Sequence, residues 1–133
     1  MPTPQIVLPA HWLPFYNATG IPAAVWADDL LTVSGHTGDA DGRYEPDTAA
    51  QLRQTFRNLT ETLAEAGLEW HDVVEITSYH VGLQAQSGIL LEIAGEFMRP
   101  PLPAWTAVGV VELFDAEAVV EVSCSAARAI AHH

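Results

Sequence analysis

The clearest pattern in the sequence is a long amphipathic segment near its middle, over about residues 47–66. Apolar side chains recur there at spacings of three and four, the period of one helix face: Ala49, Leu52, Phe56, Leu59, Leu63 and Ala66. Asp47 or Thr48 can cap the beginning of this helix, and Gly67 stands where a left-handed residue commonly ends one. The rest of the chain therefore has to offer this helix a matching apolar surface.

Around this helix the sequence predicts a second helix and several short strands. The second helix is expected over about residues 87–98, where Pro100-Pro101 stops it. Strands are expected at residues 23–26, 30–36, 73–81, 104–111 and 118–127. The first 22 residues hold five prolines and are expected to be irregular, with room for one edge strand at residues 6–8. The prediction is a single α+β domain over residues 1–133, with two helices on one face of a mostly antiparallel sheet.

Composition narrows the classes of function. The chain has 133 residues, 49% hydrophobic and 17% charged, which is typical of one globular domain. Its net charge is −12, with five arginines and no lysine, which argues against binding to nucleic acid or anionic membranes. The lack of lysine also excludes a lysine Schiff base. Cys124 is the only cysteine, so an internal disulfide and a multi-cysteine zinc site are excluded, and we expect neither metal nor organic cofactor.

The sequence also gives an expectation about location. The N-terminal residues lack the cationic and apolar regions of a signal peptide, and no apolar run is long enough to span a membrane. We therefore expect a cytoplasmic protein.

The predicted strands are apolar on both sides. Val74 and Ile76 alternate with Val73, and Val119 alternates with Val120. Two helices cover only one face of a sheet, so the other face needs a cover of its own. With no further helix predicted, we expect another copy of the chain to provide it.

Five short motifs follow one another in a recognisable order. They lie at residues 31–38 (LTVSGHTG), 49–59 (AAQLRQ, then NL), 66–77 (AGL, then DVVEIT), 103–108 (PAWTAV) and 120–122 (VEV). Together they resemble the RidA/YjgF family of reactive intermediate deaminases, over about residues 20–127. The resemblance implies a chorismate-mutase-like fold, a homotrimer and ligand clefts between subunits. It also implies hydrolysis of enamines or imines, such as 2-aminoacrylate, to a keto acid and ammonia. Members have also been called endoribonucleases, a role that the net charge of −12 argues against here.

Three positions depart from the family pattern. Trp105 stands where the family has its carboxylate-binding arginine, Ile21 where it has a pocket tyrosine, and Leu90 near its pocket asparagine. An indole offers one N–H and a π face, whereas a guanidinium clamps a carboxylate with two hydrogen bonds. We therefore expect a more apolar pocket and a substrate without the usual carboxylate clamp.

Glu121 is the leading catalytic candidate because it matches the family's water-binding glutamate. Strand alternation places it on the same face as Ser123 and opposite Val120 and Val122. In an apolar cleft its carboxylate can position a water, take its proton and return it to the leaving amine. The alternative is a carboxylate that only bonds a neighbouring strand or subunit.

The other candidate residues come mainly from two of the motifs. We expect the substrate to be bound by Ser34, Gly35, His36, Ile21, Trp105 and Thr106. His80 is a further candidate acid or base, because histidine titrates near neutrality. For both histidines the simpler interpretation is a surface or strand-end position.

The favoured hypothesis is thus a RidA-like enamine or imine deaminase that acts on a small reactive intermediate. One alternative is a trimer that only binds small metabolites in the same cleft. Another is a pathway enzyme that uses the cleft for aminomuconate-type deamination, tautomerisation or cyclisation. Catalysis requires that Glu121 face an enclosed pocket, which binding alone does not.

Overall fold

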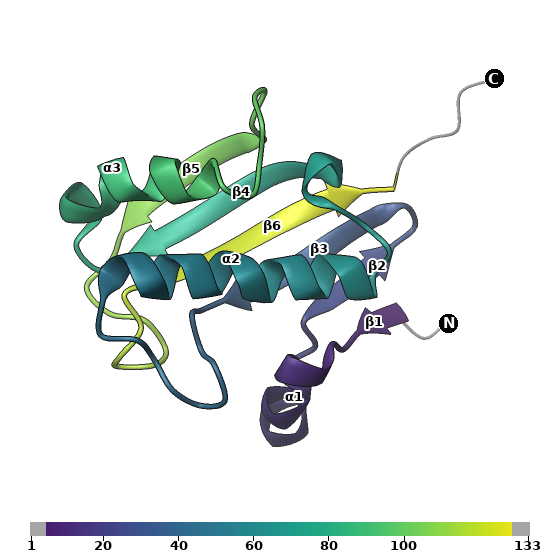
Figure 1. Cartoon of the computed structure of the whole chain (residues 1–133). Coiled ribbons are helices and arrows are strands. Elements are labelled where there is room, and N and C mark those ends of the chain that lie inside the picture. The colour runs from purple at the N-terminus through teal and green to yellow at the C-terminus, as the bar shows by residue number, and fades with distance from the viewer. Residues whose placement is uncertain (1–4, 129–133) are drawn as a thin grey trace.

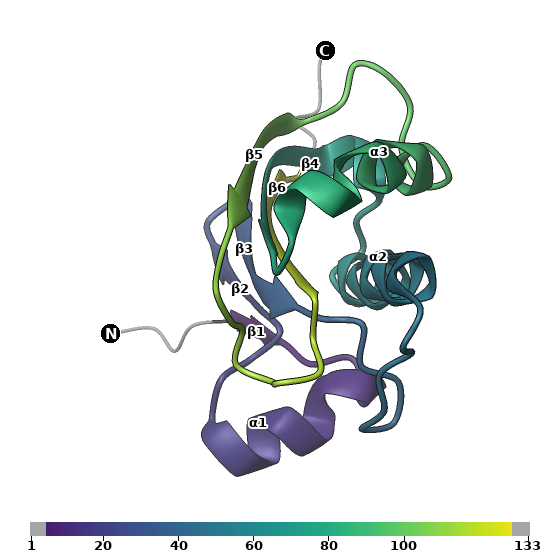
Figure 2. The same cartoon turned by 90° about the vertical axis from the view of Figure 1, so that its left-hand side faces the viewer.

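The computed structural model describes residues 5–128, so both ends of the predicted domain lie outside the described residues. One six-stranded sheet carries two long helices on one face, as Figures 1 and 2 show. The strands are β1 (Gln5–Val7), β2 (Ala24–Ala27), β3 (Leu30–His36), β4 (Val73–His80), β5 (Ala104–Gly109) and β6 (Val120–Ala127). They lie in the order β1-β2-β3-β6-β4-β5, and only β4 and β5 run parallel. The predicted α+β class with a mostly antiparallel sheet is confirmed.

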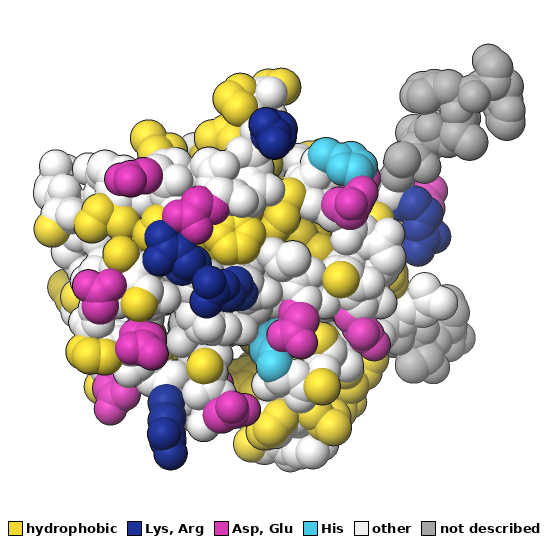
Figure 3. Space-filling view, in the orientation of Figure 1, with side chains coloured by type: hydrophobic (Ala, Val, Ile, Leu, Met, Phe, Trp, Pro, Cys, Tyr) yellow, Lys and Arg dark blue, Asp and Glu magenta, His cyan; other side chains and the backbone are white. Residues whose placement is uncertain are grey.

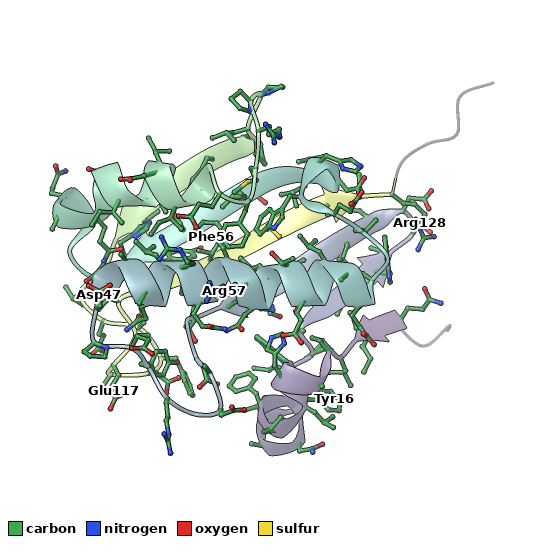
Figure 4. All side chains as sticks on the ribbon, viewed as in Figure 1. Tyr16, Asp47, Phe56, Arg57, Glu117 and Arg128 are labelled. Atoms are coloured by element: carbon green, nitrogen blue, oxygen red, sulfur yellow. The ribbon has the colours of Figure 1, made fainter. Side chains whose placement is uncertain are left out.

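Helix α2 (Thr48–Glu65) is the amphipathic segment that the sequence predicts. The Asp47 side chain caps its beginning by accepting a hydrogen bond from the Ala50 N–H, and Gly67 follows its end with a φ of +77°. Asp47 and Phe56 mark the beginning and the middle of this helix in Figure 4. Phe56 is fully buried and stacks on Phe97 at a centroid distance of 5.5 Å, which anchors α2 to the sheet.

Helix α3 (Leu83–Ala94) lies about one turn earlier than the sequence predicts. It begins after Gly82, whose φ of +89° turns the chain, and it ends at Ala94, with Gly95 as its C-terminal cap. Phe97 and Met98 still pack on the core, but from the segment after the helix. Because their spacing continues that of the helix, the sequence placed the end of the helix about one turn too late.

The N-terminal segment is more regular than predicted. The expected edge strand is present as β1, which pairs with β2. Residues 10–19, however, form a 3₁₀ turn (Ala10–Trp12) followed by α1 (Leu13–Thr19). Pro14 is tolerated because it lies in the first turn of α1, where the missing N–H has no helical partner. The buried Trp12 fixes this segment through its indole N–H, which donates to the Ile21 carbonyl at 2.8 Å.

The two faces of the sheet differ in character. On β6 the side chains of Val120, Val122, Cys124 and Ala126 are buried against the helices, and Glu121, Ser123 and Ser125 lie on the other face, partly exposed. On β4 the pairing register shifts between Val73 and Glu75, so Val73 and Ile76 both face the helices and Val74 is exposed. The expectation of an apolar second face is therefore wrong for β4, where Thr77 and Tyr79 occupy that face.

Candidate functional site

A cavity of about 100 Å³ lies beside Glu121, where the end of β3 meets α1 and the turn that precedes β6. Its walls carry the aromatic side chains of Trp12, Phe15, Tyr44 and Phe114, and the carboxylates of Asp39, Asp115 and Glu121. Glu121 and Gly35 also border an open groove of about 600 Å³ on the outer face of the sheet. Glu121 thus faces both a small, half-open cavity and a broader groove that is open to solvent.

Gly35 makes room for the Glu121 carboxylate. A Cβ atom at Gly35 would lie only 2.5 Å from Glu121 Oε2, which no real side chain allows without displacing it. Burial raises the pKa of Glu121, and the charge of Asp115 raises it further. Among the described residues no hydrogen bond holds this carboxylate. It is therefore free to take and return a proton.

Asp115 is held in place by a chain of hydroxyl groups. The Tyr44 hydroxyl donates to Asp115 Oδ2 at 2.6 Å, and it accepts from Thr37 Oγ1 at 2.8 Å. Burial and the bond to Asp115 raise the pKa of Tyr44, so the phenol keeps its proton. This chain joins segments 71 residues apart and fixes the negative charge of Asp115 near Glu121.

Two residues of the cavity wall have buried polar atoms without a hydrogen-bond partner among the described residues: both ring nitrogens of His11, and one carboxylate oxygen of Asp39. The surroundings of Asp39 show how its carboxylate is left without a donor. Its backbone is secured, because Asn58 Nδ2 donates to the carbonyls of both Thr37 and Asp39. Its side-chain Oδ1, by contrast, is sealed from solvent and has no hydrogen-bond partner among the described residues. A buried carboxylate oxygen without a donor is costly.

His36 belongs to the wall of the cavity, yet it is fully buried on the helix side. Strict alternation along β3 would place His36 on the same face as Ser34, but an irregularity between Val33 and His36 turns the imidazole toward α2. Nδ1 donates to the Ser34 carbonyl at 2.7 Å, which leaves Nε2 to accept from Thr62 Oγ1 at 2.7 Å. Burial lowers its pKa to about 3, so at neutral pH His36 is an uncharged wall residue.

His80 and Trp105 lie on the helix side of the sheet and do not line the Glu121 cavity. Trp105 Nε1 donates to Ser78 Oγ at 2.9 Å, and Ser78 Oγ in turn donates to His80 Nε2 at 2.8 Å. His80 Nδ1 donates to Gln86 Oε1, and Gln86 Nε2 donates to two backbone carbonyls. Burial lowers the pKa of His80. Both histidines are the last residues of their strands, as the strand-end interpretation predicted, but both are buried and neither lies at the surface. Within one subunit neither His80 nor Trp105 lines the cavity beside Glu121.

The remaining predicted ligand-binding residues do not line this cavity either. Ser34 Oγ donates to the Pro22 carbonyl and ties β3 to the segment before β2. Ile21 is exposed and receives the Trp12 indole through its carbonyl, and Thr106 is exposed on the edge strand β5. Of the predicted set, the structure brings together Glu121, Gly35 and His36.

Sequence reasoning missed most of the cavity wall. Trp12 and Phe15 lie in the segment predicted to be irregular, and Tyr44 and Phe114 lie in acidic loops. The signal in the sequence was an aromatic residue next to acidic residues in both loops, 39–46 and 110–117. This pattern indicates a site only once the fold is known to bring the two loops together.

Other features of the described residues bear on the function. A larger cavity of about 750 Å³ lies on the helix side, lined by Trp70, Phe97, Arg99 and prolines, and it does not include Glu121.

Within residues 5–128 no group of three histidine, cysteine, aspartate or glutamate side chains is placed to hold a metal ion. None of the helices there combines the length and apolarity needed to cross a membrane. On the face seen in Figure 3 the few arginines are interspersed with acidic side chains.

The chain is similar to known proteins over most of its length. Residues 17–128 match the family described as endoribonuclease L-PSP. The RutC family protein YjgH of Escherichia coli (strain K12) is 42% identical over 115 residues, which cover 84% of this chain and 88% of that protein.

Solved structures agree with this similarity. A structure of protein YJGH superposes with a TM-score of 0.84 at 39% identity, covering 93% of this chain and 95% of that one. Rv2704 from Mycobacterium tuberculosis, a member of the YjgF/YER057c/UK114 family, gives a TM-score of 0.79 at 26% identity, covering 95% and 100%. The motifs, the fold and these similarities together establish that the chain belongs to the RidA/YjgF (endoribonuclease L-PSP) family.

Proposed function

We propose that this protein is a RidA-like deaminase that hydrolyses a small imine, or the enamine in equilibrium with it, at Glu121. The observation that carries the proposal is the position of the Glu121 carboxylate. It lies against Gly35 at the edge of a small, half-open cavity, and no hydrogen bond holds it among the described residues. This is the placement that separates a catalytic cleft from one that only binds.

The proposed reaction needs one group that moves protons. A water bound by Glu121 adds to the carbon of the protonated C=N bond, and the carboxylate takes the proton that this water loses. The protonated Glu121 then gives that proton to the nitrogen of the resulting carbinolamine. The C–N bond breaks, the hydroxyl becomes the carbonyl, and its proton leaves with the nitrogen as ammonium. The raised pKa of Glu121 suits both transfers.

The substrate is proposed to lack the carboxylate that the family's arginine binds. No arginine lines the Glu121 cavity, and Trp105, at the arginine position, bonds Ser78 on the helix side. An anionic substrate would meet the carboxylates of Asp39, Asp115 and Glu121 there.

We also propose the homotrimer that is typical of the family, with the open groove covered by a neighbouring copy. Its support is an apolar patch after β5, where Val111 is 93% exposed and Phe114 is 84% exposed. Phe114 borders both the cavity and the groove. Burying two such side chains stabilises an interface by roughly 1.5–3 kcal/mol each.

The deaminase proposal is tested by the Glu121→Gln variant. Small imines are generated continuously by an amine oxidase and trapped with semicarbazide, so hydrolysis appears as a loss of semicarbazone and a faster release of ammonia. The variant keeps the size of the side chain but loses the base, so we expect hydrolysis to fall about 10²–10⁴-fold. Glu65→Gln, at the exposed end of α2, changes the net charge equally and is expected to keep full activity. Full activity in Glu121→Gln would show that this carboxylate is not the base and would contradict the proposal, whereas no hydrolysis by the unaltered protein would leave a cleft that only binds.

A further inference from the structure

The Glu121 cavity carries a charge pattern that goes beyond a site for neutral imines. We infer that it recognises a small organic cation without a carboxylate, such as a protonated imine or a primary ammonium ion. This inference deepens the proposed function and rests on it, because it names the class of substrate for the same site. It depends on four separate features of the cavity wall.

The first feature is the balance of charge. Three carboxylates line the cavity, and no arginine does. Burial lowers the pKa of His36 to about 3, so this imidazole is uncharged at neutral pH and cannot offset the carboxylates. His11 is the other imidazole in the wall, and its Nδ1 lies 3.0 Å from the carboxylate oxygen Oε2 of Glu61. A cation in the cavity would relieve the repulsion among the carboxylates.

The second feature is the unpartnered oxygen of Asp39. Asp115 has the Tyr44 hydroxyl as a donor, but Asp39 Oδ1 has none among the described residues although it is sealed from solvent. A buried acceptor of this kind needs an N–H or O–H donor. An ammonium or iminium group supplies such a donor together with the compensating charge.

The third feature is the aromatic wall. Trp12 and Phe15 meet edge to face at a centroid distance of 5.1 Å, and Phe15 meets Phe114 edge to face at 6.3 Å. The Trp12 ring also lies 4.5 Å from the His36 ring, which fixes its orientation. Aromatic faces attract organic cations by roughly 0.5–2 kcal/mol when water is excluded.

The fourth feature is size. At about 100 Å³ the cavity is far smaller than the roughly 300–1,000 Å³ of pockets that hold drug-sized ligands. It fits a cation with a short carbon chain, and it has no room for a second charged group far from the first.

The inference is tested with three probes of similar size and different charge: propylammonium, 1-propanol and propionate. Binding is followed by NMR through the backbone amides of Gly35 and Thr37, so the signal also locates the ligand. We expect propylammonium to bind at least tenfold more tightly than 1-propanol, a difference of about 1.4 kcal/mol. Propionate is expected to cause no shift at these two amides.

The Asp39→Asn variant removes the unpartnered charge and is expected to weaken propylammonium binding at least fivefold, or about 1 kcal/mol. The matched control is Asp28→Asn, which changes the net charge equally at an exposed turn whose φ of 53° suits asparagine. It is expected to leave the affinity unchanged.

The inference is overturned if propionate or 1-propanol binds as tightly as propylammonium, or if propylammonium leaves both amides unmoved at tens of millimolar. If the three probes bind equally well while hydrolysis still depends on Glu121, this inference alone is overturned and the deaminase proposal stands. Cation binding in a protein whose Glu121→Gln variant keeps full turnover would support this inference and contradict the proposed role of Glu121 in hydrolysis.

Discussion

Two groups of polar side chains lie at different places on the same sheet, and they differ in how well they are satisfied. On the helix side, Trp105, Ser78, His80 and Gln86 form a chain in which each donor has an acceptor. In the Glu121 cavity, Asp39 Oδ1 has no donor among the described residues, and Glu121 lies close against Gly35.

This difference gives a criterion for telling polar groups with a structural role from those that bind a ligand. A buried polar chain that is fully bonded stabilises one conformation and leaves nothing for a ligand. A buried group without a partner is costly to the fold and persists where something else binds it. By this criterion His80 and Trp105 have structural roles, and the Glu121 cavity is the proposed site.

The largest effect that sharpens this comparison is expected from Gly35→Ala. The added Cβ would collide with the Glu121 carboxylate and push it out of position. Because small misplacements of a catalytic group reduce rates steeply, we expect imine hydrolysis to fall about tenfold to a hundredfold, with little change in melting temperature. The assay is the semicarbazide competition described above.

The control for that variant is Gly88→Ala, in the middle of α3. A Cβ there meets no atom within 4 Å, so activity should stay the same and stability should rise by about 0.5–1 kcal/mol. Unchanged activity in Gly35→Ala would show that the position of the Glu121 carboxylate does not matter.

The next effect concerns the helix-side chain and is expected in stability. Ser78→Ala removes both the acceptor for the Trp105 indole and the donor for His80 Nε2. Two buried groups lose their partners, so we expect the free energy of unfolding to fall by about 2–4 kcal/mol in urea titrations. The exposed Ser87→Ala in α3 serves as the control, with a change within about 0.5 kcal/mol.

The smallest effect is a pH dependence of stability caused by His36. Its pKa is about 3 in the folded chain and about 6.5 when unfolded, so between these values the unfolded state binds more protons. This contribution is fully present above pH 6.5 and is lost as the pH falls, by about 1.4 kcal/mol per unit. From pH 7.5 to pH 5, urea titrations should show His36 costing about 2 kcal/mol of stability. An unchanged slope in His36→Gln would show that another group causes the loss.

The sequence predicted the structural features that depend on neighbouring residues in the chain, and it did not predict those that depend on distant ones. The stripe on α2, its Asp47 cap and the alternation that places Glu121 opposite Val120 are set by neighbours in the chain, and all were predicted. The end of α3 was not, because Phe97 continues a helical spacing that Gly95 interrupts.

The cavity itself depends on features that no local pattern contains. Irregular pairing in β3 and β4 moves His36 and Ile76 to the helix side, and a shift of one residue reverses every face assignment beyond it. The bond from Tyr44 to Asp115 joins two loops across 71 residues. Trp12 reaches the cavity because a proline-rich segment forms a short helix.

The most direct test of the account combines two variants and two readouts in one experiment. Glu121→Gln and Ser78→Ala are compared for imine hydrolysis and for melting temperature, at a temperature where both remain folded. The account predicts that Glu121→Gln loses activity about 10²–10⁴-fold and keeps its melting temperature, and that Ser78→Ala melts earlier and keeps its activity per folded molecule. The opposite pattern, with activity retained in Glu121→Gln and lost in folded Ser78→Ala, would place the reaction on the helix side and contradict the central claim.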